Sequence, residues 1–278
     1  MVGPLPYIGG KNRLAAKIIS LLPEHTTYVE AFAGGAQVLF HKPPSNVEVL
    51  NDLDFDVVNF FRVCQWHYEE LIRYLRFCLI SRKLHELHLA SNPAVLTDIQ
   101  RAGRFFYLQK NSFGGLVIKQ KFHYGVTQNS NYNLERIPEA IERAHQRLLR
   151  VQIESLPYEQ ILERYDRPTT FFYLDPPYWG PKLYKFNFTE EDFKTMAARL
   201  AGLKGKFILS LNDRPEVRAA FSRFQIQSVE LAYTAKRDTR ARHNEVLITN
   251  FDARPKKRPA HGLTDRPRGA SFRARTSR

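Results

Sequence analysis

Residues 27–52 read TYVEAFAGGAQVLFHKPPSNVEVLND. The runs 27–30 and 47–50 are short and rich in apolar and β-branched residues, which predicts two strands. Between them, Gly34-Gly35 predicts a tight turn that leads into a helix ending at His41. A strand, a turn, a helix and a second strand in this order are typical of the beginning of an α/β domain.

The same alternation returns in the second half of the chain, where strands are predicted at 151–155, 170–174, 206–211, 226–230 and 245–250. Helices are predicted near 158–164, 189–203 and 214–221. Strands that alternate with helices favour a mainly parallel sheet that helices cover on both faces. We therefore predict the α/β fold class.

A helical block separates the two halves. Apolar residues recur at helical intervals from about 54 to 110, and another helix is predicted near 138–149. The segment 111–133 is rich in Gly, Asn, Ser and aromatic residues, which predicts an ordered loop or hairpin. The expected organisation is a catalytic domain in two parts, an inserted and mostly helical domain, and a basic disordered tail, at residues 1–57, 151–252, 58–150 and 253–278, respectively.

The charge balance indicates a polyanionic partner. The 278 residues carry a net charge of +14, and nine of the Lys and Arg residues fall within 253–278. Lys and Arg neutralise phosphates and supply most of the sequence-independent affinity for nucleic acid. No apolar run is long enough to cross a membrane, and the first residues do not resemble a signal peptide, so we expect a cytoplasmic protein.

Cysteine and histidine spacing predicts no metal site. Cys64 and Cys78 lack a CxxC partner and are predicted to be reduced core residues. His85 and His88 lie one helical turn apart, but no third ligand accompanies them, so we interpret them as part of a surface helix.

Residues Asp175-Pro176-Pro177-Tyr178 follow the apolar run 171–174. Proline fixes φ and has no N–H, so the carbonyls here are free to accept hydrogen bonds while Tyr178 can lie against a flat ring. A ring-conjugated amino group becomes a better nucleophile when acceptors hold both of its hydrogens. The Asp175 carboxylate and the Pro176 carbonyl are suitable acceptors, and they would stabilise the positive charge that develops on nitrogen. The same four residues could instead form a simple turn.

The glycine turn has an acidic partner at the end of the next predicted strand. Asp52 is placed where a carboxylate can accept hydrogen bonds from ribose hydroxyls, and Gly34 lets a ligand approach the backbone. The segment Tyr7-Ile8-Gly9-Gly10-Lys11 adds an aromatic ring and an ammonium group that could meet a carboxylate, without the spacing of a phosphate-binding Walker loop. A nucleoside that carries an amino-acid carboxylate, such as S-adenosylmethionine, suits these groups.

Together, and in their order along the chain, these motifs resemble the DNA adenine methylase (Dam-like) family of S-adenosylmethionine-dependent adenine-N6 methyltransferases. The matching segments are 7–11, 30–35, 50–54, 175–178, 210–213 and 245–250. The resemblance covers about residues 5–251. It implies a Rossmann-like methyltransferase sheet with an inserted target-recognition domain, double-stranded DNA as the substrate, and a bacterial or phage-encoded enzyme with a possible cognate restriction endonuclease.

The resemblance also implies roles for single residues. Asp175 corresponds to the catalytic acid, which also borders the cofactor, and Tyr178 to the ring that stacks on an adenine flipped out of the duplex. Pro176 and Pro177 complete the catalytic motif. The implied cofactor contacts are Tyr7, Lys11, Glu30, Phe32, Gly34, Asp52 and Asp175. The candidate contacts to DNA phosphates and base edges are Arg104, Lys110, Asn111, Lys119, Lys121 and Tyr124.

Three other functions fit part of the sequence. Related tetrapeptides serve cytosine amino-group methylation, and RNA adenine methyltransferases share the tetrapeptide, although the long insertion 58–150 favours a reader of duplex DNA. A non-catalytic nucleic-acid-binding protein with a relic pocket would not need Lys11, Asp52 and Asp175 together. Gln109 and Asn111-Ser112 depart from the family's usual residues, and the segment 122–133 has no clear counterpart of the proline-bearing stretch of GATC-specific members, so the resemblance does not imply that recognition sequence.

Overall fold

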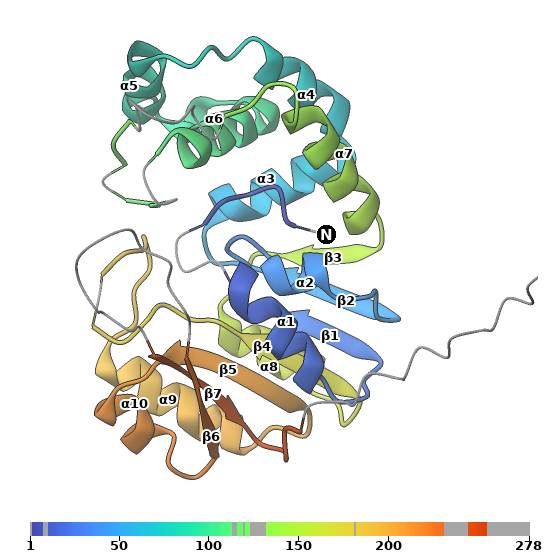
Figure 1. Ribbon diagram of the computed structural model, residues 1–278, viewed down its shortest axis with the longest axis vertical. Coiled ribbons are helices and arrows are strands. Elements are labelled where there is room, and N and C mark those ends of the chain that lie inside the picture. The colour runs from blue at the N-terminus through green and yellow to red at the C-terminus, as the bar shows by residue number, and fades with distance from the viewer. Residues whose placement is uncertain are drawn as a thin grey trace, which may run out of the picture.

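The computed structural model describes residues 2–7, 11–112, 116–118, 120–122, 132–180, 182–230 and 244–254. Within them, one sheet of seven strands has the order β3-β2-β1-β4-β5-β7-β6. The strands are β1 (Thr27–Glu30), β2 (Val47–Asn51), β3 (Val151–Glu154), β4 (Thr170–Leu174), β5 (Lys206–Asn212), β6 (Gln225–Glu230) and β7 (Asn244–Thr249). The first five run parallel, and β7 is antiparallel to both of its neighbours. The prediction of a mainly parallel sheet is confirmed (Figure 1).

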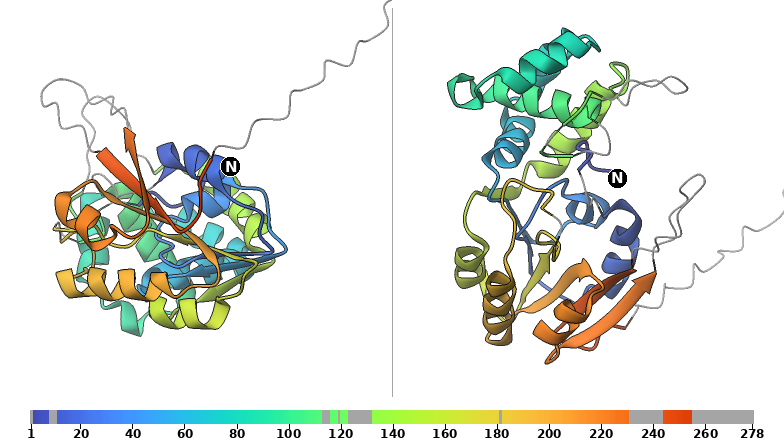
Figure 2. Two further views of the ribbon diagram at one scale, coloured as in Figure 1. Left: turned by 90° about the horizontal axis from the view of Figure 1, so that it is seen from below. Right: turned by 90° about the vertical axis from the view of Figure 1, so that its left-hand side faces the viewer.

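Helices cover both faces of this sheet (Figure 2). On one face lie α1 (Asn12–Leu21) and α2 (Gln37–His41), and on the other lie α8 (Tyr158–Tyr165), α9 (Glu190–Ala201) and α10 (Pro215–Ala220). Strand β4 shows why both faces of the sheet need a cover of helices. Phe171 and Tyr173 belong to the core with α1, while Phe172 and Leu174 belong to the core with α9, because successive side chains of a strand point to opposite faces.

Between β2 and β3 the chain leaves the sheet and forms a helical block. Its elements are α3 (Phe55–Trp66), α4 (Tyr68–Arg76), α5 (Arg82–Ala90), the 3-10 turn η1 (Pro93–Val95), α6 (Asp98–Asn111) and α7 (Ile137–Leu148). Figure 1 shows the block above the sheet. Helix α3 contacts α6, α7 and β3, so it joins the block to the sheet. The predicted boundary between residues 57 and 58 therefore falls inside this helix.

Local sequence explains where the helices of the block begin and how they pack. The Asp54 side chain accepts a hydrogen bond from the Asp56 N–H and caps α3, while Thr97 and Gln100 form a capping box at the start of α6. Phe60 of α3 stacks on Phe106 of α6 with ring centroids 5.5 Å apart. The core of the block is thus aromatic and continuous with the core on the α1 side of the sheet.

The predictions for the cysteines and for His85 can be compared with the structure. Cys64 and Cys78 are buried free thiols, as predicted. The interpretation of His85 as a surface residue is wrong, because the residue is 1% exposed and its ring bonds to the Ser112 hydroxyl at 3.2 Å, where α5 packs against the end of α6. In the described part of the chain, no helix is both long enough and apolar enough to span a membrane. Most of the predicted basic tail, residues 255–278, lies outside the described residues.

The contact between α4 and α6 depends on a glycine. A Cβ at Gly103 would lie 2.3 Å from Cδ1 of Tyr74, so Gly103→Ala should force the ring aside and lower the free energy of unfolding by about 1–3 kcal/mol. Gly202→Ala is the matched control, because its nearest neighbour would be the Arg199 carbonyl at 3.7 Å. Urea unfolding of both variants checks this. Equal stability of Gly103→Ala and wild type would contradict the close packing.

Candidate functional site

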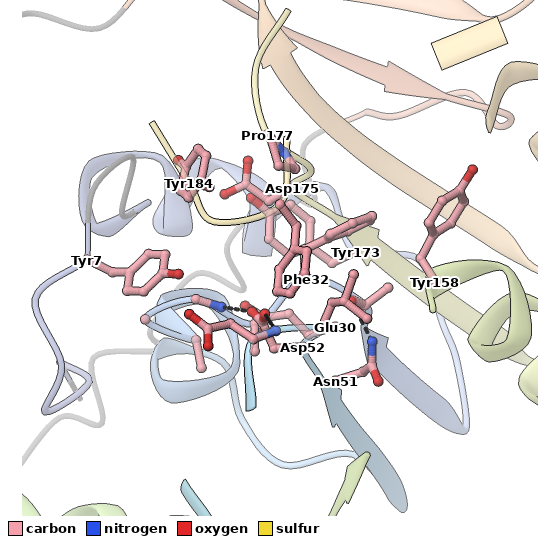
Figure 3. Close-up of a pocket in the computed structure, with 18 of the residues that line it drawn as sticks. Tyr7, Glu30, Phe32, Asn51, Asp52, Tyr158, Tyr173, Asp175, Pro177 and Tyr184 are labelled. Atoms are coloured by element: carbon pink, nitrogen blue, oxygen red, sulfur yellow. Dashed lines mark hydrogen bonds between the residues drawn. The ribbon is translucent and has the colours of Figure 1, made fainter. Parts of the chain in front are cut away.

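A cavity of about 580 Å³ lies where the strand order reverses, between β1 and β4. Ligands of open α/β sheets bind at such a point, outside the carboxyl ends of the strands, and this volume is ordinary for a small-molecule site. The residues predicted to contact a cofactor all line the cavity: Tyr7, Lys11, Glu30, Phe32, Gly34, Asp52 and Asp175. Figure 3 shows Asp52 and Asp175 between Tyr7 on one side and Tyr158 on the other.

The glycine turn holds the N-terminal segment against the cavity. Gly34 has a φ of 46°, and a Cβ there would lie 2.9 Å from the ring of Tyr7. The Gln37 amide donates to the carbonyls of Leu5 and Gly35, and its oxygen accepts from the Gly3 N–H. Glycine is therefore required at position 34 by the left-handed backbone and by the approach of the Tyr7 ring.

Two acidic residues after β2 provide hydrogen-bond acceptors at the cavity wall. The Asp52 carboxylate accepts from the N–H groups of Gly34 and Asp54, each at 2.8 Å. Burial raises the pKa of Asp52 to about 6, and these backbone bonds oppose the shift. Oδ2 of Asp54 is buried and has no hydrogen-bond partner among the described residues. Because a carboxylate accepts about four hydrogen bonds, both side chains have acceptor capacity left for ligand hydroxyls.

Glu30 and Phe32 line the cavity in different ways. Oε2 of Glu30 accepts from the Tyr28 hydroxyl at 2.9 Å and from the Leu39 N–H at 3.0 Å, so this oxygen ties β1 to α2. Burial raises the pKa of Glu30 to about 8. The Phe32 ring instead belongs to an aromatic wall, with centroids 5.5 Å from Tyr158 and 5.8 Å from Phe188.

At the end of β4, Asp175 joins the cavity to a buried charged cluster. Its Oδ1 lies 3.0 Å from Nζ of Lys11 and accepts from the Ser210 hydroxyl at 2.9 Å. Among the described residues, no side chain donates to Oδ2. Burial raises the pKa of Asp175 to about 6, with Lys11 opposing the shift. The protein therefore holds Oδ1 of this carboxylate, while Oδ2 can accept a hydrogen bond from a ligand.

The aromatic residue of the tetrapeptide lies on the far side of this cluster. The Tyr178 hydroxyl donates to Oε1 of Glu245 at 2.7 Å and also contacts the Lys11 ammonium. Nζ of Lys11 lies 4.6 Å from the centroid of the Tyr178 ring. Pro177 lines the cavity, whereas Pro176 is buried. The structure thus places Lys11 over the ring that was predicted to stack on a base.

Ser210, Asn212 and Glu245 lie within the family-like segments 210–213 and 245–250, but the sequence alone predicts no role for any of them. The pairing of Leu174 with Leu209 places Ser210 beside Asp175. The Asn212 side chain bonds to the backbone N–H and carbonyl of Trp179 at 3.2 and 3.1 Å and so fixes the chain after the tetrapeptide. The spacing of Ser210 and Asn212 is the signal that could have found them, because residues two apart on a strand share a face.

The loop after the tetrapeptide adds a further group that the motifs did not indicate. Tyr184 stacks on Tyr7 with centroids 6.2 Å apart. Next to it, Nζ of Lys185 lies 2.9 Å from Oδ1 of Asp54 and 2.5 Å from Oδ2 of Asp56, and Arg101 of α6 pairs with the same Asp56. These ion pairs connect the loop that borders the cavity to the helical block.

The predicted DNA contacts differ in accessibility. Lys121 is exposed, whereas Lys110 is half-buried with its ammonium 5.4 Å from the Phe106 ring centroid. Nε of Arg104 donates to the His88 carbonyl and the Ser91 hydroxyl, which anchors α5 to α6. Asn111 is fully buried and donates to the Tyr107 carbonyl, so it could reach a base edge only if the end of α6 rearranged. The remaining two, Lys119 and Tyr124, lie outside the described residues.

Comparison with known families identifies the family and activity of the chain. Residues 7–235 match the model of the D12 class N6 adenine-specific DNA methyltransferases, and the chain belongs to this family. It is therefore an enzyme that transfers a methyl group from S-adenosylmethionine to N6 of adenine in DNA. The predicted family, activity and cofactor are confirmed.

Three relatives illustrate the breadth of the likeness. The Type II methyltransferase M1.LlaDCHI of Lactococcus lactis subsp. cremoris is 26% identical over 268 residues, which cover 88% of this chain and 94% of the relative. The Type II methyltransferase M.CviBI of Paramecium bursaria Chlorella virus NC1A is 27% identical, covering 62% and 67%. The DNA N-6-adenine-methyltransferase of Escherichia phage P1 is 25% identical, covering 87% of this chain and 34% of the phage protein.

The buried carboxyl of Glu30 should make stability depend on pH. Its pKa rises from 4.5 to about 8 on folding, so the stability that its proton contributes is complete below 4.5 and is lost as the pH rises through 8. Between about pH 6 and pH 9, wild type should lose on the order of 1 kcal/mol more of its free energy of unfolding than Glu30→Gln, which carries no titrating proton.

Urea unfolding at several pH values measures this difference, with the exposed Glu24→Gln as the control for the same change of side chain. Parallel pH dependences of wild type and Glu30→Gln would mean that Glu30 is already ionised in the folded protein at low pH.

Proposed function

We propose that the cavity between β1 and β4 binds S-adenosylmethionine and that Asp175 presents the amino group of a flipped adenine to it. The observation that carries this proposal is the position of Asp175. Its carboxylate lines the cavity and also belongs to the cluster of Lys11, Tyr178 and Glu245 on its other side. A group at this boundary can contact the methyl donor and the methyl acceptor together.

The lining residues fit the proposed cofactor. Asp52 would accept hydrogen bonds from ribose hydroxyls, as would Oδ2 of Asp54, for which the described residues offer no hydrogen-bond donor. The rings of Phe32, Tyr158 and Phe188 form an apolar wall against which an adenine ring could pack. Tyr7 and Tyr184, stacked on each other, would close the opposite side. When bound, the cofactor supplies an activated methyl group on a positively charged sulfur.

The tetrapeptide would prepare the acceptor. Oδ1 of Asp175 is held by Ser210 and Lys11, which leaves Oδ2 for one hydrogen of the amino group, and the Pro176 carbonyl would accept the other. An ionised Asp175 stabilises the positive charge that nitrogen acquires as it gains a methyl group. The same carboxylate is positioned to receive the proton that this nitrogen then loses. With a pKa of about 6, Asp175 is mostly ionised at neutral pH.

The helical block would hold the DNA. The amino group of an adenine within a duplex is inaccessible to in-line methyl transfer, so the target base must leave the stack. The exposed Lys121 and the half-buried Lys110 are near the antiparallel bridge between Ser112 and Phe122, and we assign this region to phosphate contacts. Arg104, Lys119 and Tyr124 belong to the same proposed set, which Asn111 would join only if the end of α6 rearranged on DNA binding. Arg101 and the Lys185 ion pairs would connect this region with the cavity.

The relatives that are named type II methyltransferases support a role for this enzyme beside a restriction endonuclease. Two of them match this chain over most of its length. We propose that the enzyme protects DNA from a cognate restriction endonuclease that cleaves the same sequence. Sequencing of modified adenines in plasmid DNA from cells that express the protein would identify the site. Modified adenines without a common sequence context would contradict this role.

Asp175→Asn should abolish most methyl transfer. The amide keeps the shape of the carboxylate but loses the charge that stabilises the nitrogen, so single-turnover transfer should fall at least about 100-fold. Cofactor affinity should fall far less than the transfer rate, because Asp175 is one of several groups that line the cavity, and DNA affinity should stay close to that of wild type. The measurement is N6-methyladenine released from unmethylated plasmid DNA, quantified by mass spectrometry. Transfer at the wild-type rate would exclude Asp175 from the reaction.

Asp52→Asn should instead weaken cofactor binding. Loss of a charged acceptor for ribose hydroxyls should raise the Kd for S-adenosylmethionine roughly 10- to 100-fold. Isothermal titration calorimetry of Asp52→Asn and of Asp175→Asn separates the two roles. An unchanged Kd for Asp52→Asn would show that the ribose binds elsewhere.

A further inference from the structure

Glu245 is a buried acid that the reaction described above leaves without a role. It is 6% exposed and lies at the beginning of β7. Because β7 runs antiparallel to β5, its first residues pair with the last residues of β5, and Glu245 lies opposite Asn212. The chain therefore brings a carboxylate to the same edge of the sheet at which Asp175 ends β4.

The two oxygens of Glu245 serve different partners. Oε1 accepts from the Tyr178 hydroxyl at 2.7 Å, and Oε2 lies 3.5 Å from Nζ of Lys11. Oε2 has no hydrogen bond within the described part of the chain, so its contact with Lys11 is electrostatic. A buried charge of this kind is costly unless a partner of opposite sign lies close. Glu245 and Lys11 thus hold each other in place.

Lys11 links Glu245 to the proposed catalytic acid, Asp175. Its ammonium lies 3.0 Å from Oδ1 of Asp175 and also lies over the Tyr178 ring. The position of the ammonium fixes which oxygen of Asp175 faces inward, and the hydrogen bond to the hydroxyl fixes the direction in which the Tyr178 side chain points. Both positions depend on Glu245.

We propose that Glu245 is a positioning residue for methyl transfer, which holds Lys11 and Tyr178 so that Oδ2 of Asp175 and the Tyr178 ring are presented to the target adenine. This inference rests on the proposed function of Asp175. Glu245 touches neither substrate nor cofactor and acts through its two partners. Removing its charge should therefore slow the methyl-transfer step while cofactor binding is retained.

Because Glu245 is charged, the proposal also predicts how the pH dependence of kcat/KM for DNA should change in Glu245→Gln. Burial raises the pKa of Asp175, Lys11 lowers it and Glu245 raises it. Other ionisable groups that face the cluster are Glu30 of β1, Asp52 after β2, Tyr173 of β4, and Tyr178 and Tyr184 of the following loop. These groups are unchanged in Glu245→Gln. The variant removes a negative charge that raises the pKa of Asp175, while Lys11, which no longer shares its ammonium with Glu245, keeps Asp175 as its carboxylate partner. Both effects lower the pKa of Asp175, so the acid limb of kcat/KM for DNA should move to lower pH.

The experiment compares full-length wild type, Glu245→Gln and Glu216→Gln, an exposed glutamate of α10 that serves as the matched control. Methylation of unmethylated plasmid DNA is followed from about pH 5 to pH 9, with saturating S-adenosylmethionine. For Glu245→Gln we expect kcat to fall roughly 10- to 100-fold, KM for the cofactor to stay near the wild-type value, and the acid limb to move down by about half a pH unit or more. Glu216→Gln should match wild type.

Two outcomes would overturn the proposal. The first is wild-type kcat in Glu245→Gln. The second is a lower rate at every pH with the acid limb in place and a lower Tm, which would mark Glu245 as a purely structural residue. If Asp175→Asn also methylated normally, the proposed function itself would fail, whereas inactive Asp175→Asn beside normal Glu245→Gln would remove only the role of Glu245.

The hydrogen bond between Tyr178 and Glu245 can also be tested with Tyr178→Phe. This second variant keeps the proposal testable if Glu245→Gln does not fold. It removes the hydroxyl that binds Glu245 and keeps the ring. A double-mutant cycle with Glu245→Gln should be non-additive, because Tyr178→Phe removes the hydrogen bond and Glu245→Gln removes the charge of its acceptor. Additive losses in kcat, or wild-type kcat in Tyr178→Phe alone, would show that Glu245 does not act through Tyr178.

Discussion

The site depends on the geometry of parallel strands. Strands that run in one direction end at one edge of the sheet, and at the reversal of strand order between β1 and β4 the two following chain segments separate and leave space between them. Here one segment is the glycine turn and the other is the tetrapeptide that begins with Asp175. Antiparallel β7 adds a chain segment that begins at this edge, which is why Glu245 arrives beside groups far from it in sequence.

Burial of charge is the second constraint. Lys11, Asp175 and Glu245 are largely removed from water, and each would be costly alone. Their contacts offset much of that cost and also orient them, because a charge with two partners has few positions of low energy. Farther out, Lys185 and Arg101 share Asp56, so the loop beside the cavity and the helical block are linked by the same kind of contact.

Much of this architecture could be predicted from the sequence, because the relevant signals are local. Strands β1 and β4 begin and end where apolar runs meet a turn, and the residues proposed to contact the cofactor belong to contiguous motifs at strand ends or, for Tyr7 and Lys11, just before α1. The roles of Glu245, Lys185 and Arg101 could not be predicted, because each depends on contacts between segments distant in the chain. The burial of His85 and Asn111 likewise follows from packing around α6, which periodicity alone does not reveal.

A crystal structure of the protein with S-adenosylhomocysteine would show whether the donor and acceptor sites meet at this edge. We expect the ribose hydroxyls to bind Asp52, with the adenosine against the aromatic wall and the sulfur facing Asp175 across the cavity. A ligand bound outside this cavity, or inside it with the sulfur turned away from Asp175, would contradict the assignment of the site.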